Sequence, residues 1–271
     1  MERHQVELDA PAFGRAGTVI RYGHYGRPVL VFPSEAGRAW DYESNGMIGA
    51  VAHLIDEGRV KVYCVDSFDD ASWSDRSLPI EERARRHQAY QAWITDQVAA
   101  YVGSDSAGAS DAIVTGCSMG AYHALQIALQ RADLFPVAIC QSGNYDPSTW
   151  HGWGERGDAA YFTNPVDYVP HLHGDHLDWL RSRLHVVLTV GEGAWETHPT
   201  GSLPSARQMA HLLGEKGLST ISTSGARTSP TTGRGGAGRS HTTCPGSAET
   251  NPAPACRPWL GSTTWPPRRT I

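Results

Sequence analysis

Short apolar runs alternate with longer amphipathic stretches up to residue 218. A strand is predicted at residues 17–22, and apolar runs predict buried strands at 28–32, 60–65, 111–115, 135–140 and 185–190. Such uninterrupted runs of Val, Ile and Leu are typical of strands that are covered on both faces. The spacing of apolar positions predicts helices at 40–57, 80–102, 119–130 and 204–216. This alternation predicts an α/β fold with a mostly parallel central sheet and helices on both faces.

Two stretches depart from this alternation. Residues 144–184 are rich in Trp, Tyr, His, Gly and Asp, and we interpret them as a loop-and-helix insertion that forms a wall of the site. Residues 219–271 are dominated by Ser, Thr, Gly, Pro and Arg, with Glu249 as their one acidic residue and no Lys. A segment of this kind buries too little apolar surface to offset its ordering entropy, so disorder is predicted. The expected organisation is one domain over 1–218 and an aberrant tail over 219–271.

Composition narrows the class of protein. Hydrophobic residues make up 40% of the chain and charged residues 19%, as in globular proteins. The formal net charge of −5 argues against a nucleic-acid partner. No apolar run is long enough for a transmembrane helix, and the N-terminus carries no apolar signal region. The expected location is therefore the cytoplasm, with no membrane contact.

The main chemical signal is Gly116-Cys-Ser-Met-Gly120, a G-x-S-x-G sequence. It lies between a predicted strand and a predicted helix, which is the context of a nucleophile elbow. Such a turn strains the Ser118 backbone and presents its hydroxyl at a helix N-terminus, where developing negative charge is favoured. Chance matches to this pattern are frequent in a glycine-rich chain, but its position predicts that Ser118 is the nucleophile.

An oxyanion hole needs two backbone donors. One should be the N–H of Met119, the residue after the nucleophile. The other should come from the loop after strand 28–32, where Pro33 has no N–H and Ser34 or Glu35 is the candidate. An ordinary strand-to-helix connection is the alternative interpretation of this loop.

The acid and the base should follow Ser118 in that order along the chain. Glu196 is preferred as the acid because its loop reaches back toward the site, and Glu192 is the alternative; either could be a surface carboxylate. No histidine stands out as the base. The weak candidates are His198, His211 and His241, whereas His123, five residues after Ser118 in the same helix, should point away from it.

Other polar and aromatic residues are candidates for the substrate pocket. Asp66 and Trp73 follow the strand 60–65, and Trp150 belongs to the insertion; local turn formation and ordinary packing are the alternatives. His171, His173, Asp175, His176 and Asp178 form a polar cluster, but a loop sequence alone makes a weak metal signal. We predict no metal.

Taken together, four segments resemble one family. Phe32-Pro-Ser-Glu35, Asp66-Ser-Phe-Asp69, Gly116-Cys-Ser-Met-Gly120 and Gly191-Glu192 follow the order seen in the esterase D-like esterases of the α/β-hydrolase superfamily, which are distantly related to mycolyltransferases. The resemblance covers about residues 15–218. It implies a serine carboxylic ester hydrolase that acts through an acyl-serine on a small-molecule ester, without metal or organic cofactor. An acyltransferase and a catalytically dead, binding-only relative are the alternatives.

The tail breaks this resemblance. The family implies a last strand and helix with the catalytic histidine between them, and here both are predicted to be missing. We interpret the tail as out of frame from about residue 219, which would impair the enzyme by removing its base. With suitable codons, residues 230–233 read two bases further on as His-Asp-Trp, which family members often carry. An uninterrupted gene in the family's reading frame would contradict this interpretation.

Overall fold

The computed structural model describes residues 1–225, whose centre is one mixed sheet of eight strands. The spatial order is β1-β2-β4-β3-β5-β6-β7-β8, and only the pairs β1–β2 and β2–β4 are antiparallel. The strands are β1 (Arg3–Ala10), β2 (Arg15–Tyr22), β3 (Arg27–Phe32), β4 (Val60–Val65), β5 (Ile113–Cys117), β6 (Val137–Gln141), β7 (His185–Gly191) and β8 (Ser219–Gly225). The order reverses at β3, where the chain returns from β4 to continue at β5 on the other side.

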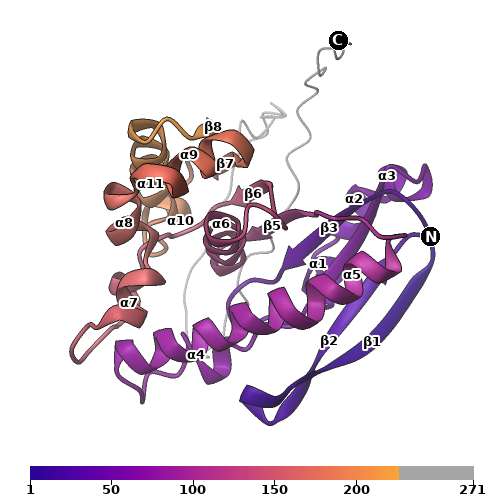
Figure 1. Ribbon diagram of the computed structural model, residues 1–271, viewed down its shortest axis with the longest axis horizontal. Helices are drawn as coiled ribbons and strands as arrows, with labels where there is room; N and C mark the ends of the chain where they lie inside the picture. The colour runs from indigo at the N-terminus through magenta and orange to yellow at the C-terminus, as the bar shows by residue number, and fades with distance from the viewer. Residues whose placement is uncertain (226–271) are drawn as a thin grey trace, which may run out of the picture.

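Helices cover the sheet and build the connections between its strands (Figure 1). They are α1 (Asp41–Ser44), α2 (Met47–Ala50), α3 (Ala52–Asp56), α4 (Ile80–Trp93), α5 (Ala99–Asp105), α6 (Met119–Gln130), α7 (Asp158–Phe162), α8 (Pro165–Tyr168), α9 (Gly174–Arg183), α10 (Ala194–Thr197) and α11 (Ser202–Glu215). The short segments are η1 (Pro11–Phe13), η2 (Asp69–Ala71), the π-helical turn η3 (Ile94–Val98), η4 (Pro147–Thr149) and η5 (Val169–His171). The turn η3 joins α4 to α5, so the helix predicted at 80–102 is one long continuous rod.

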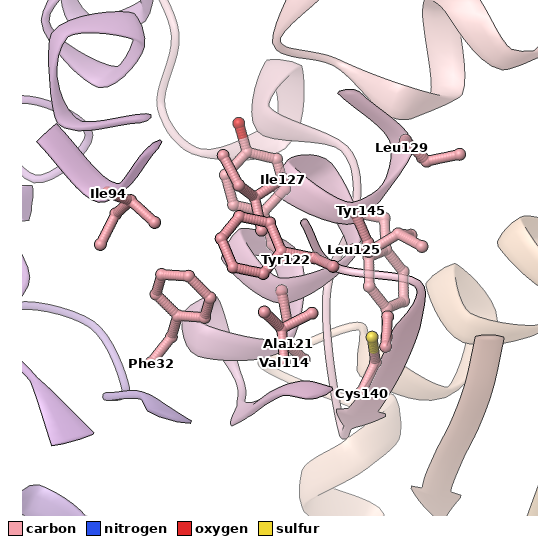
Figure 2. Close-up of a cluster of buried hydrophobic side chains, with 14 of the residues drawn as sticks. Phe32, Ile94, Val114, Ala121, Tyr122, Leu125, Ile127, Leu129, Cys140 and Tyr145 are labelled. Carbon is pink, nitrogen blue, oxygen red and sulfur yellow. The ribbon is translucent and has the colours of Figure 1, made fainter. Parts of the chain in front are cut away.

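Alternate residues of the central strands feed two separate cores. Leu30 and Phe32 of β3 point to the larger core, whereas Val31 points to a smaller one beneath α1–α3. Figure 2 shows Phe32, Val114 and Tyr122 of the larger core, which lies between the sheet and the helices α4 and α6. Burial of both side-chain sets explains the uninterrupted apolar runs and confirms helices on both faces.

Two parts of the structure differ from the sequence prediction. Strand β1 was missed because its apolar positions, Val6 and Leu8, alternate with charged residues in an edge strand that pairs antiparallel with β2. The single helix predicted at 40–57 is three short ones, because Gly46 adopts a φ of +73° between α1 and α2. A left-handed residue of this kind ends an α-helix and is tolerated best as glycine.

The strand β8 corrects the expected domain boundary. The sequence predicted that the last strand is missing and that disorder begins at residue 219, yet Ser219–Gly225 pairs with β7 in parallel along its whole length. Ile221 is 54% exposed, so this edge strand is held by ladder hydrogen bonds rather than by apolar burial. Apolar patterning cannot reveal such a strand. The remaining predictions for the tail, including the missing helix, His241 and the change of reading frame, lie outside the described residues.

The predicted insertion is helical and packs against the long helix. It contains α7, α8 and α9, and α7 contacts α4 closely. Glu81, in the first turn of α4, accepts hydrogen bonds from the N–H groups of Gly157, Ala159 and Ala160 at 2.8, 3.2 and 3.0 Å. Partial burial opposes ionisation of this carboxyl, but the three amides outweigh it and hold the pKa of Glu81 below its usual value. The N-terminus of α7 is thus capped by another helix.

Candidate active site

Ser118 stands at a strained turn between β5 and α6. Its φ of 58° and ψ of −120° are unfavourable for a residue with a side chain, and its own N–H donates to the carbonyl of Gln141 at 2.9 Å. Although its neighbours Cys117 and Met119 are buried, Ser118 is exposed. The turn therefore presents the hydroxyl at the carboxyl edge of the sheet, where ligands of open parallel sheets bind. Such strain at an exposed polar residue is typical of functional sites.

Two glycines make this turn possible. A Cβ on Gly116 would lie 2.4 Å from the backbone of Gly120. A Cβ on Gly120 would lie 2.4 Å from the carbonyl oxygen of Phe32 and 2.5 Å from that of Pro33. Helix α6 therefore begins in direct backbone contact with the end of β3. The pattern G-x-S-x-G thus has glycine at the two positions where β5, α6 and the end of β3 approach one another closely.

Carboxylates bind three amides of the loop after β3, residues 33–41. The N–H of Ser34 donates to Asp41 Oδ2 at 3.0 Å, and the N–H of Ala36 donates to Asp69 Oδ2 at 3.1 Å. The N–H of Ala39 donates to Asp66 Oδ1 at 2.8 Å. Within residues 1–225, no acceptor takes the N–H of Glu35, which lies between two amides that are bound.

Asp66 and Asp69 brace this loop from the segment after β4. Asp66 is 3% exposed and also accepts from the N–H of Thr18 at 3.0 Å, so it joins β2 to the loop. Asp69 is 1% exposed. Asp66 therefore contacts backbone donors in place of the substrate contact that the sequence predicted. The alternative interpretation, a turn of side-chain caps, describes it better.

The two candidate acids have partners in different parts of the sheet, Glu196 after β6 and Glu192 at the β8 edge. Glu196 Oε1 accepts from the hydroxyl of Ser142 at 3.0 Å, and its side chain packs on Gly191. Ser142 follows Gln141, whose carbonyl binds the N–H of Ser118. Glu196 is thus connected to the turn of the nucleophile through the end of β6.

Glu192 belongs to the far edge of the sheet. Its Oε1 accepts from the hydroxyl of Ser224 at 2.7 Å and forms an ion pair with Arg207 at 3.3 Å. These contacts join β8 and α11 on the side away from β5.

None of the histidines in residues 1–225 forms a hydrogen bond with Ser118. His198 is exposed two residues after Glu196, and His211 forms an ion pair with Glu215 on the surface of α11 at 3.4 Å. His123, which the sequence predicted to point away from Ser118, is buried in the core and is 2% exposed.

Of the two tryptophans predicted to line the substrate pocket, Trp73 is packed inside the protein. Trp73 is 1% exposed and contacts the rings of Trp150 and Tyr122 edge to face, at centroid distances of 5.6 and 6.1 Å. It therefore lies in the core rather than in a pocket, contrary to the sequence prediction. Trp150, whose ring contacts that of Trp73, is half-buried.

Sequence reasoning missed a buried cluster beside the site. His87 of α4 stacks on His123 of α6 with ring centroids 5.1 Å apart, and Nε2 of His123 donates to Asp69 Oδ1 at 3.1 Å. Neither ring nitrogen of His87 has a partner in the described structure. Burial, and secondarily His123, holds the pKa of His87 well below its usual value, so the ring is neutral. The sequence indicated this cluster only by placing one histidine on the apolar face of α4 and one on that of α6.

In the described part of the chain, no three His, Cys, Asp or Glu side chains gather where one metal ion could contact them. Over the same residues, no helix has the length and apolar character required to cross a membrane.

Solved structures with this architecture include esterases and S-formylglutathione hydrolases. A ferulic acid esterase superposes with a TM-score of 0.62 at 11% sequence identity, over 83% of this chain and 90% of that one. An S-formylglutathione hydrolase from Agrobacterium tumefaciens gives 0.61 at 17% identity, over 83% and 87%. MPT51 (FbpC1) from Mycobacterium tuberculosis gives 0.61 at 13%, over 84% and 91%. No curated sequence matches the chain.

The sheet order, the helices on both faces and the strained serine turn define an α/β-hydrolase fold. The sequence model of the family described as "Putative esterase" matches residues 24–212, and the chain belongs to this esterase family. The family and the fold agree with an enzyme that hydrolyses small-molecule esters.

Proposed function

We propose that this protein hydrolyses carboxylic esters through an acyl-enzyme formed on Ser118. The observation that carries the proposal is the exposed serine at φ 58°, held between β5 and α6 with its hydroxyl at the carboxyl edge of the sheet. In the first step the Ser118 oxygen attacks the ester carbonyl, and the alcohol leaves with a proton. Water then attacks the acyl-serine and releases the acid. Neither step requires a metal or an organic cofactor.

The negative oxygen of each tetrahedral intermediate would be held by two backbone amides. Met119 N–H is at the first turn of α6, where no helical acceptor is available, and the helix dipole also favours negative charge. Glu35 N–H is the second donor. Ser34 N–H is already bound by Asp41, so of the two candidates in the loop only Glu35 has a free amide. Because its neighbours are bound, this donor is fixed before the substrate arrives.

Glu196 is proposed as the acid that orients the histidine. Its contact with Ser142 places it at the end of β6, beside the strand that ends in the nucleophile. A carboxylate in this position stabilises the imidazolium that forms when the base accepts the serine proton. Glu192 is proposed as a structural residue of the β8 edge.

The decisive test replaces Ser118 by Ala. The variant should lose hydrolysis of p-nitrophenyl acetate by a factor of at least about a thousand and should not react with a fluorophosphonate probe. Ser182→Ala is a matched control, because this exposed serine of α9 donates only to the carbonyl of Trp179. Equal rates for the Ser118→Ala variant and the original chain would reject the nucleophile.

The base can be assigned with two further variants. His198→Ala removes the histidine of the acid loop, and His241→Ala removes the candidate outside the described residues. Loss of Ser118-dependent turnover in one of them identifies the base, since a serine without its base loses several orders of magnitude in rate.

A binding-only protein is the second candidate. It is favoured by one observation, that no histidine within residues 1–225 contacts the Ser118 hydroxyl. In that case the folded chain would bind esters without turnover and the fluorophosphonate would label nothing. An acyltransferase of the same fold is distinguished by product analysis with an added sugar alcohol, which would appear as a new ester.

A further inference from the structure

The buried pair His123–Asp69 connects the helix of the nucleophile to the loop of the proposed oxyanion hole. His123 lies on α6, five residues after Ser118, and its Nε2–H donates to Asp69 Oδ1 at 3.1 Å. The other oxygen of the same carboxylate accepts the N–H of Ala36 at 3.1 Å. The side chains of His123 and Asp69 are each 1% exposed, so water does not compete for the bond between them.

We propose that His123 is a positioning residue, which acts through Asp69 to hold the Glu35 amide at the correct distance from Ser118. The inference rests on the proposed function, because it assigns a role relative to the proposed oxyanion donor. Ala36 follows Glu35 directly, so a displacement of the Ala36 N–H moves the peptide that precedes it. His123 does not contact substrate and takes no part in proton transfer at Ser118.

The geometry explains why this connection controls position. Loop 33–41 already touches the first turn of α6 at Gly120, so the elbow and the loop share one contact near Ser118. The bonds from His123 to Asp69 and from Asp69 to Ala36 add a second contact, one helical turn deeper in the core. Two separated contacts fix both the distance and the angle between helix and loop, whereas one contact leaves a pivot.

The buried carboxylate makes the connection sensitive to its partners. Asp69 Oδ1 accepts from no other side chain in residues 1–225, so replacing His123 leaves a buried charge with half of its hydrogen bonds. Such a charge is costly and the loop must shift to solvate it. A displaced oxyanion donor weakens the transition state more than it weakens substrate binding.

His87 provides the matched control. It is equally buried, stacks on His123 and belongs to the same aromatic cluster, but it forms no hydrogen bond in the described structure. A change at His87 perturbs the packing of the cluster without breaking the connection to Ala36.

The experiment compares three variants at a temperature where all are folded. His123→Leu should lower kcat about tenfold with KM within about twofold, less than complete loss of an oxyanion donor because the amide is displaced and not removed. His123→Gln, whose side-chain amide can take the position of Nε2, should recover kcat to within about threefold. His87→Leu should stay within about twofold. Equal kcat losses in His123→Leu and His87→Leu, or no rescue by Gln, would overturn the proposal.

Amide hydrogen exchange tests the connection without relying on catalysis. In His123→Leu the Ala36 amide should exchange at least about tenfold faster, while the amides in the middle of α6 keep their protection. Unchanged exchange at Ala36 would overturn the inference even if the chain hydrolyses esters. Absence of Ser118-dependent hydrolysis together with faster exchange at Ala36 would reject the proposed function and retain the connection.

Discussion

The two loops that flank Ser118 are built in opposite ways. Loop 33–41 has three of its amides bound by Asp41, Asp66 and Asp69, and the last two carboxylates are almost completely buried. The acid loop, residues 191–200, is largely exposed, and Glu196 has a single side-chain partner there. The side that would stabilise negative charge is therefore fixed in advance, whereas the side that would carry protons is open.

This difference agrees with the chemistry of the two sides. Electrostatic stabilisation depends on dipoles that need no rearrangement when charge develops, so a rigid loop suits an oxyanion hole. An acid and base can adjust on binding, and their hydrogen bonds are often loose in the absence of substrate. Substitutions that loosen the oxyanion loop should therefore lower stability as well as turnover, whereas substitutions in the acid loop should lower mainly turnover.

The largest effect is expected where the rigid loop meets the elbow. Gly120→Ala should lower the free energy of unfolding by about 3 kcal/mol, because its new methyl would lie 2.4 Å from the carbonyl oxygen of Phe32. Chemical denaturation measures this loss. Gly214→Ala, in α11 with no neighbour within 4 Å, should be neutral or slightly stabilising. Similar losses for both glycines would mean that the contact at the elbow is not fitted as tightly as described.

The acid loop should respond mainly in turnover. Glu196→Gln is expected to lower kcat about a hundredfold while the unfolding midpoint changes little, because the residue is only partly buried. Glu192→Gln should change kcat less than threefold, since its contacts are with Ser224 and Arg207. Steady-state kinetics measure kcat for both variants. A larger loss of kcat in Glu192→Gln than in Glu196→Gln would make Glu192 the acid and Glu196 the structural residue.

Asp66 tests the rigid side by stability. Asp66→Asn should cost about 2 kcal/mol of unfolding free energy, because an amide cannot accept from both Thr18 and Ala39 and places a donor against one of them. Asp70→Asn serves as the control, since Asp70 is 54% exposed and its ion pair with Arg15 is a surface contact worth less than about 1 kcal/mol. An Asp66 variant no less stable than the Asp70 variant would refute the bracing role.

The smallest effect is a dependence of stability on pH through His87. The pKa of His87 is lowered in the folded protein by burial and by His123, so the unfolded chain binds its proton first as the pH falls. The stability contribution is complete above the usual histidine pKa of about 6.5 and declines as the pH drops toward the lower folded value, by at most about 1.4 kcal/mol per pH unit. In His87→Leu the unfolding free energy measured from pH 7.5 to 5 should decline less steeply. An identical slope would show that His87 does not titrate in this way.

The elements that sequence predicted are those whose signal is local. The buried strands β3, β4, β5 and β7 are continuous apolar runs, and the serine turn is written in five consecutive residues. Strand β8 could not be predicted, because an exposed edge strand is defined by its hydrogen bonds to β7. The sequence could not decide between Ser34 and Glu35 as the second oxyanion donor, because the choice depends on the bond from the Ser34 N–H to Asp41 in the folded protein. The pairing of His123 with Asp69 joins positions 54 apart in sequence, and nothing near either residue indicates the other.

The cap that Glu81 provides for α7 has a consequence for engineering. Because the carboxylate belongs to α4 and its three donors belong to the insertion, residues 144–184 are not a self-sufficient module. In a chimera that carries the insertion of another esterase, Glu81 can orient the new insertion only if its first helix starts at the same position. Its first amides then reach the carboxylate as those of Gly157, Ala159 and Ala160 do. A graft without matching amides would leave the glutamate unsatisfied, and the transplanted wall would have to find another anchor.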